Sequence, residues 1–132
     1  MTPTLPSRGR AYSTPLKSNV GHMKSVTIDA TQIQDESTFH DVFAKTLGFP
    51  KFYGRNMNAW IDCMSYVDMP DAGMSTIWVE PGEVLVLSIK DAEGLKQRCP
   101  ELWLAFLECA AFVNWRIVEK GGPAVLTVAA YA

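Results

Sequence analysis

The sequence predicts a small α/β domain built around a parallel sheet that helices cover. Short apolar segments rich in β-branched residues alternate along the chain with longer segments of helical period. Two of the short segments, residues 83–89 and 124–130, are almost continuously apolar, which is typical of strands buried on both faces of a parallel sheet. At 132 residues, the chain is long enough for one domain with a proper core and too short for two. Strands separated by helices therefore favour a parallel sheet with helical crossovers.

The first half of the domain is expected to begin with a strand at residues 24–29, where polar and apolar positions alternate. A first helix is predicted at residues 35–47, and Gly48 is well placed to end it. Asn56 is a favourable N-cap for a second helix, which we expect to reach about residue 67.

The second half follows a Pro- and Gly-rich loop at residues 69–73. A possible edge strand at residues 76–80 comes first, and a strand buried on both faces follows at residues 83–89. Asp91 then caps a short helix that ends at Arg98, and Pro100 opens a long helix. The last expected element is a buried strand at residues 124–130. The long helix carries one apolar stripe that is expected to face the core: Leu102, Trp103, Phe106, Leu107, Ala110, Val113 and Ile117.

Residues 1–22 differ in composition from the rest of the chain. They are rich in Pro, Ser, Thr and Gly and have no apolar periodicity, so we expect a disordered tail outside the fold. Three basic residues and no acid give the tail a weak likeness to a transit peptide, whereas the Gly-His directly before Met23 is typical of sequence left by cloning. We interpret Met23 as the functional start and residues 23–132 as the domain.

The charge of the chain favours a basic protein partner over a nucleic acid. The net charge of the whole chain is −2, but residues 23–132 hold nine basic and 14 acidic residues, so their net charge is −5. An acidic domain repels phosphate backbones and attracts basic partners, mainly through the association rate. Direct nucleic-acid binding is therefore not expected.

The composition predicts no cofactor, metal site or membrane segment. Cys63, Cys99 and Cys109 are an odd number of cysteines without the spacing of a disulfide framework or a zinc site, which favours a reducing, cytoplasmic location. The longest apolar stretches are too short to span a bilayer. The acids of one loop lack the spacing of a calcium site and are more simply solvated: Asp68, Asp71, Glu80 and Glu83.

The strongest functional signal lies in residues 48–65, GFPKFYGRNMNAWIDCMS. On the predicted second helix, Asn58, Asp62 and Ser65 fall on one narrow polar stripe. Phe52 and Tyr53 lie in the loop before it, and aromatic side chains beside a carboxylate are typical of interface hot spots. A core helix with a solvated edge has the same periodicity, so the pattern alone leaves both interpretations open.

The same segment resembles the signature of the barstar family of intracellular ribonuclease inhibitors. The motif is Phe-Pro-x-Phe-Tyr-Gly-x-Asn-x-x-Ala-x-x-Asp-Cys at residues 49–63, and the order of elements is similar over residues 24 to about 130. The resemblance implies a three-stranded parallel sheet flanked by about four helices. It also implies that the second helix and the loop before it bind in a ribonuclease active site and block it. The carboxylates of this surface would then occupy the positions of the substrate phosphates.

The resemblance assigns roles to individual residues. Asp62 takes the place of the family's central inhibitory aspartate, and Phe52 that of a contacting tyrosine. Tyr53, Gly54 and Asn56 match the motif, which implies that Gly54 supplies the loop turn and Asn56 the helix cap.

The sequence also departs from the family at the implied binding surface. Asn58 stands where a second contacting aspartate is expected, and Ile61 where a tryptophan is expected. A family glutamate near the end of the last helix corresponds to Arg116, counted back from Gly121 without gaps. Residues 69–83 look like an insertion relative to barstar itself, and we refer to this segment as the insertion. These changes bear on the identity of the partner and leave the predicted fold intact.

We therefore predict a bacterial protein without catalytic activity that binds and inhibits a ribonuclease or nuclease toxin of basic charge, in the manner of an immunity protein. The alternative is a barstar-like module whose partner is not a ribonuclease. An enzyme would need Cys63 as nucleophile, His40 as base and Asp62 as orienting acid. We expect Cys63 to be buried and inert, and His40 to be a half-exposed residue of another helix.

Overall fold

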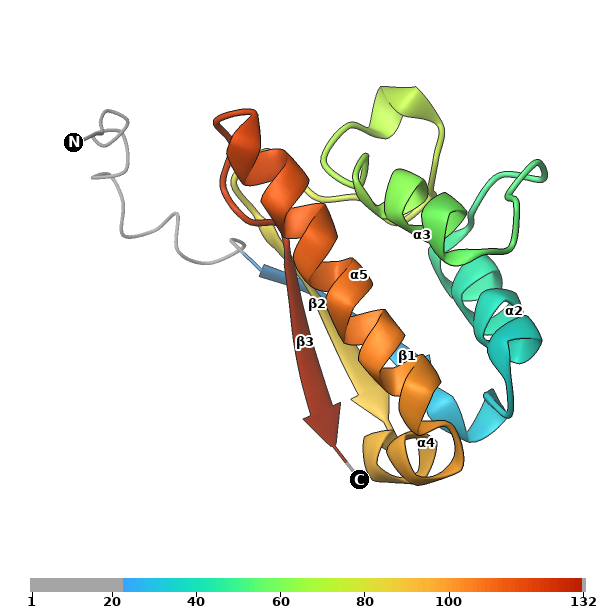
Figure 1. Ribbon diagram of the computed structural model, residues 1–132. Helices are drawn as coiled ribbons and strands as arrows, with labels where there is room; N and C mark the ends of the chain where they lie inside the picture. Colours follow the sequence, from blue (N-terminus) through green and yellow to red (C-terminus); the bar gives the residue numbers. More distant parts are fainter. Residues whose placement is uncertain (1–22, 132) are drawn as a thin grey trace.

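Three parallel strands form the sheet in the order β1 (Met23–Asp29), β2 (Val84–Lys90) and β3 (Leu126–Tyr131) (Figure 1). The computed structural model describes residues 23–131, so the predictions for residues 1–22 lie outside the described part. β1 pairs with β2 from Met23 opposite Val84 onwards, and β2 pairs with β3 from Leu85 opposite Leu126 onwards. The predicted three-stranded parallel sheet is confirmed.

Four α-helices accompany the sheet in the described part, which confirms the predicted α/β arrangement. They are α2 (Glu36–Leu47), α3 (Met57–Met64), α4 (Ala92–Arg98) and α5 (Pro100–Glu119), with short 3-10 turns η2 (Ala30–Gln32) and η3 (Pro70–Ala72). None of these helices is both long and apolar enough to cross a membrane.

Within residues 23–131 the core lies on one face of the sheet, so the prediction of strands buried on both faces is wrong. Leu85, Leu87 and Ile89 of β2 are at most 1% exposed, whereas the alternate positions of β2 are only partly buried. In β3, which begins at residue 126 and not 124, Leu126 alone is buried. Neighbouring strands place Ser25 and Ser88 on the uncovered face, where their hydroxyl oxygens lie 3.2 Å apart. Hydroxyl side chains among the apolar ones let this face meet solvent.

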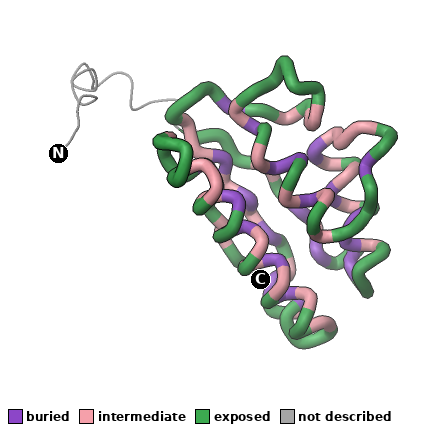
Figure 2. The backbone as a smooth tube through the Cα atoms, turned by 45° about the horizontal axis from the view of Figure 1, so that its top comes forward, coloured by how far each residue is buried: buried purple, intermediate pink, exposed green. Residues whose placement is uncertain are grey.

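The first and last helices follow the predicted patterns closely. Asp35 caps α2, because its carboxylate accepts a hydrogen bond from the Thr38 backbone amide at 2.9 Å while the Thr38 hydroxyl accepts one from the Asp35 amide. Along α5, buried and exposed positions alternate (Figure 2), and the buried members belong to the predicted stripe: Trp103, Phe106, Ala110 and Val113. Both helices therefore turn their apolar faces to the core.

Two predictions for the segment between α2 and β2 are wrong, one for a strand and one for the end of a helix. Residues 76–80 form no strand, because their backbone makes single contacts instead of a ladder: Thr76 donates to the Leu47 carbonyl and Val79 to the Val67 carbonyl. The second helix ends at Met64, not near residue 67. Tyr66 and Val67 continue it only as a turn, with hydrogen bonds to the carbonyls three residues back.

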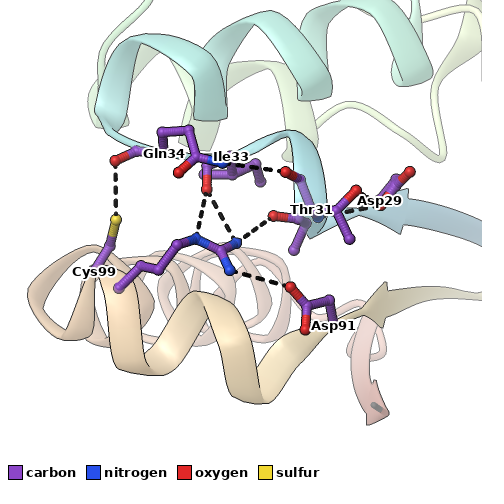
Figure 3. Close-up of polar contacts among 8 residues, drawn as sticks. Asp29, Thr31, Ile33, Gln34, Asp91 and Cys99 are labelled. Atoms are coloured by element: carbon purple, nitrogen blue, oxygen red, sulfur yellow. Dashed lines mark hydrogen bonds and ion pairs between the residues drawn. The ribbon is translucent and has the colours of Figure 1, made fainter.

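Arg98 joins α4 to the connection between β1 and α2, and Figure 3 labels two of its partners, Ile33 and Asp91. Its guanidinium donates to the Ala30 carbonyl at 2.6 Å and to the Ile33 carbonyl at 3.1 Å, and it also pairs with the Asp91 carboxylate at 3.1 Å. The predicted capping residue, Asp91, makes no capping hydrogen bond with its side chain. Asp91 stands at the N-cap position with a left-handed backbone, and its carboxylate binds Arg98 instead.

Candidate functional site

The candidate site is the loop at residues 49–56 together with α3, which starts where the loop ends. Gly48 ends α2 with φ of 69°, and a Cβ atom there would collide with Thr76 of the insertion. Within the loop, Tyr53 donates its backbone amide to the Pro50 carbonyl at 3.0 Å, and its ring packs on Phe49 with the ring centroids 4.7 Å apart. The loop is thus folded against the domain before α3 begins.

Arg55 fastens this loop to α2. Its backbone is left-handed, with φ of 56°, and its guanidinium donates to the Asp41 carboxylate at 2.7 Å and to Ser37 at 3.1 Å. The prediction that Gly54 supplies the turn is wrong, because the left-handed residue is Arg55. A Cβ atom at Gly54 would lie 3.4 Å from Cβ of Ala59, which is ordinary van der Waals contact.

Asn56 and the core hold α3 in place. The Asn56 side chain accepts a hydrogen bond from the Ala59 amide at 2.8 Å, which caps the helix. Trp60 and Met64 are fully buried in the core on the inner side of α3. A short helix anchored at its start and along its inner face presents its outer side chains with little freedom.

The structure brings two of the four predicted contact residues together. Phe52, 76% exposed, and Asp62, whose side chain is 58% exposed, line one surface hollow of about 170 Å³. Asn58 is exposed on α3 but does not line this hollow, and Ile61 is half-buried and packs against the core. Met74 of the insertion lines the hollow as well, which sequence reasoning did not foresee.

A second residue that sequence reasoning missed is Arg116 of α5. Its guanidinium donates to the Asp62 carboxylate at 3.1 Å and to the Ser65 hydroxyl at 3.2 Å. A signal was present in the sequence, since Arg116 occupies the position implied for a family glutamate. The count showed a lost acid, but only the packing of α5 on α3 shows that the arginine binds Asp62 itself.

The family assignment rests on residues 23–129, which match the family model described as Barstar (barnase inhibitor). The chain belongs to the barstar family. Over 49 residues it is 37% identical to a Bacillus subtilis (strain 168) protein named "Putative ribonuclease inhibitor YrdF". That match covers 36% of this chain and 54% of the relative, so the two chains are compared over about half of the relative's length.

Within this barstar-family fold, Cys63 and His40 do not form a catalytic pair. Cys63 is 2% exposed, and burial together with the nearby Asp62 charge raises the pKa of its thiol to about 11. His40 is 1% exposed, so the prediction that it is half-exposed is wrong. Its ring nitrogens meet the Tyr53 hydroxyl at 2.5 Å and the Glu36 carboxylate at 3.2 Å. A protonated, enclosed thiol is a poor nucleophile.

The acids of residues 68–83 do not gather into a metal site. Among residues 23–131, no three His, Cys, Asp or Glu side chains are placed to hold a metal ion together. Asp68, Asp71 and Glu80 instead line a surface groove, whereas the Glu83 carboxylate accepts a hydrogen bond from the Glu80 amide at 2.8 Å and closes a turn.

His40 predicts a pH dependence of stability. Burial lowers the pKa of His40 below its ordinary value near 6.5, and the nearby Arg55 charge acts in the same direction, while Glu36 and Asp41 oppose it. Below about pH 6.5, His40 therefore binds a proton more readily in the unfolded chain than in the folded chain. We expect the free energy of unfolding to fall on acidification by up to about 1.4 kcal/mol per pH unit from this group alone.

Urea unfolding of wild type and His40→Gln between pH 7.5 and 5.5 measures this effect. Glutamine does not titrate, so the stability gap between the two proteins should narrow as the pH falls. The other histidine of the chain, His22, lies outside the described residues and serves as the control: His22→Gln should keep the wild-type slope. A pH-independent gap between wild type and His40→Gln would exclude His40 as the source.

Proposed function

We propose that this chain is a protein inhibitor that binds a ribonuclease and covers its active site with α3 and the loop at residues 49–56. The observation that supports this proposal most directly is that the exposed Phe52 ring of the loop and the exposed Asp62 carboxylate of α3 line one hollow, and that α3 is anchored in the core. Membership of the barstar family and the printed name of the Bacillus relative support the same role.

The chemistry of the partner follows from this arrangement. A ribonuclease binds the phosphates of RNA with cationic side chains, and a carboxylate offers such side chains an oxygen acceptor of the same charge sign. Phe52 offers a ring for stacking or apolar contact, as a base of RNA does. In this proposal Asn58 and Ile61 lie at the margin of the contact, because neither lines the hollow.

A second candidate is a barstar-like module whose partner is not a ribonuclease. The Arg116–Asp62 ion pair favours it, because the guanidinium already neutralises part of the charge that a cationic active site would recognise. We place inhibition of a ribonuclease first, since the Asp62 side chain stays 58% exposed beside Arg116 and meets that guanidinium through Oδ1, which leaves Oδ2 for a partner.

The test is capture of the partner from the source cell, followed by a ribonuclease assay of the purified complex and of the separated partner. We expect the separated partner to cleave a fluorogenic RNA and to lose that activity when this chain is added back at a stoichiometric ratio. The Cys63→Ala variant should inhibit equally well, since no catalytic step by this chain is proposed. A partner without nuclease activity, or turnover by this chain that disappears in Cys63→Ala, would contradict the proposal.

A further inference from the structure

The insertion at residues 69–83 carries a second surface groove, of about 520 Å³, beyond the hollow around Asp62. Its apolar lining includes Met69, Val79 and Trp78, and the Trp78 side chain is 37% exposed. Its other lining residues include three carboxylates, those of Asp68, Asp71 and Glu80. None of the residues that line the groove is basic.

The insertion is held to the domain by specific contacts, so the groove has a defined shape. Val79 is fully buried, and its amide donates to the Val67 carbonyl at 2.8 Å. Gly73 closes the turn of η3 through a bond to the Pro70 carbonyl. In Figure 1 the segment that carries η3 arches beside α3.

The groove continues the proposed binding surface. Asp68 and Met69 line it, and the same two residues line an adjoining cavity together with Ser65 and Arg116. Arg116 binds Asp62, so an unbroken path of side chains runs from α3 to the groove. One protein partner that covers Asp62 is therefore close enough to cover the groove as well.

The charges of the two places differ. At α3, Arg116 offsets Asp62, and Asn58 is neutral. Residues 68–83 hold four acids and no basic residue. Cations lie near the groove: the Lys24 ammonium group donates to the Trp78 carbonyl at 2.7 Å and lies 5.0 Å from the centre of the Trp78 ring, and Arg116 and Lys120 line the adjoining cavity. Among the described residues, none of these four acids takes part in an ion pair, so the negative charge of this surface is offset less at the groove than at Asp62.

We infer that the groove of the insertion is a second docking site for the ribonuclease, and that it receives an arginine or lysine side chain of that enzyme. The acidic rim attracts the cation, and Met69 and Trp78 offer apolar surface to its aliphatic stem. A nuclease carries cationic side chains around its active site to hold RNA, which gives the charge complementarity. This inference rests on the proposed function and adds a second site at which this chain contacts the ribonuclease.

The experiment compares variants in which carboxylates are replaced by uncharged amides of equal size, and it measures how each variant binds the captured ribonuclease. Asp71→Asn combined with Glu80→Gln removes two charges from the groove, and Glu93→Gln combined with Glu101→Gln removes two exposed charges from the first turns of α4 and α5. Stopped-flow association rates are measured at two ionic strengths. We expect the groove pair to slow association by about 3- to 10-fold at low salt and much less at high salt, and the control pair to change it less than about twofold.

Trp78→Phe and Trp78→Ala test the contact itself. We expect Trp78→Ala to raise the dissociation rate at both ionic strengths, and Trp78→Phe to restore most of the loss, with unfolding midpoints recorded for both variants. If the groove pair behaves like the control pair and Trp78→Ala leaves dissociation unchanged, the groove is not a docking site. If Asp62→Ala still weakens binding in that case, the proposed function stands without it. If the captured partner is not a ribonuclease, the proposed function itself fails.

The basic segment at residues 1–22 of the same chain is an alternative occupant of the groove. A chain that starts at Met23 should show the same effect of the groove pair as the full chain. If the effect disappears when residues 1–22 are removed, the groove binds that segment and the inference is overturned.

Discussion

Replacing Asp62 by alanine should weaken binding of the captured ribonuclease by about 2 kcal/mol or more, close to 30-fold in Kd. Two effects add in the same direction. The partner's cationic groups lose their carboxylate, and Arg116 loses its ion-pair partner at 3.1 Å and then faces those cations with an uncompensated charge. Isothermal titration calorimetry, or competition where binding is too tight, measures the loss directly.

Arg116→Gln separates these two effects. It leaves the Asp62 carboxylate in place but removes the charge that offsets it, so association with the ribonuclease should accelerate at low salt. In the background of Arg116→Gln, Asp62→Ala should cost less than in wild type, because no free guanidinium is created.

The matched control for Asp62 is Asp41 of α2, whose side chain is 60% exposed and forms an ion pair with Arg55 of the loop. Asp41→Ala removes an equally exposed, ion-paired carboxylate outside the hollow, and Ser37 still holds Arg55. Its effect on binding should stay well below that of Asp62→Ala. Equal losses for the two variants would show that general charge, and not a contact at Asp62, controls the affinity.

Replacing Trp60 by alanine should lower the free energy of unfolding by about 3–5 kcal/mol, the largest effect on stability that we expect from the candidate site. Trp60 is fully buried and meets Phe43 and Phe106 edge-on, with the ring centroids 5.6 and 5.8 Å apart. Alanine would leave a cavity at the centre of this cluster and loosen the inner face of α3. Urea unfolding followed by far-ultraviolet circular dichroism avoids the change in tryptophan fluorescence.

Two further variants show whether the packing of Trp60 is the cause. The indole nitrogen of Trp60 is buried without a hydrogen-bond partner, so Trp60→Phe removes an unsatisfied group together with some volume and should cost much less than alanine. Trp115 is 55% exposed and stacks on Phe112, and Trp115→Ala should cost under about 1 kcal/mol. A loss for Trp60→Ala as small as that for Trp115→Ala would contradict the assigned role of the cluster.

Local features of the sequence were sufficient for most of the fold. The stop at Gly48 and the cap at Asn56 depend on hydrogen bonds and backbone angles within a few residues, so their signals are local and the helices end or begin there. The apolar stripe of α5 depends only on helical period, and its central members are buried. The motif at residues 49–63 likewise predicted the family, because motif residues stand at fixed spacings.

Errors arose where a residue's environment is set by distant parts of the chain. Val84 and Val86 are apolar, yet they are only partly buried because no described helix covers their face of the sheet. His40 is polar, yet it is buried because Tyr53 and Glu36 satisfy its ring nitrogens. Periodicity reports what a side chain prefers, and burial depends on what packs over it.

The candidate site divides in the same way. From the sequence alone, Phe52 and Asp62 could be placed on a loop and an adjacent helix, and the acidic insertion at residues 69–83 could be recognised. Only the tertiary structure shows that Arg116, 54 residues away, pairs with Asp62, and that Asp71 and Glu80 of the insertion line a groove continuous with α3. An ion pair between two helices depends on their packing, which no local pattern encodes, and this packing decides where the negative charge of the surface remains free.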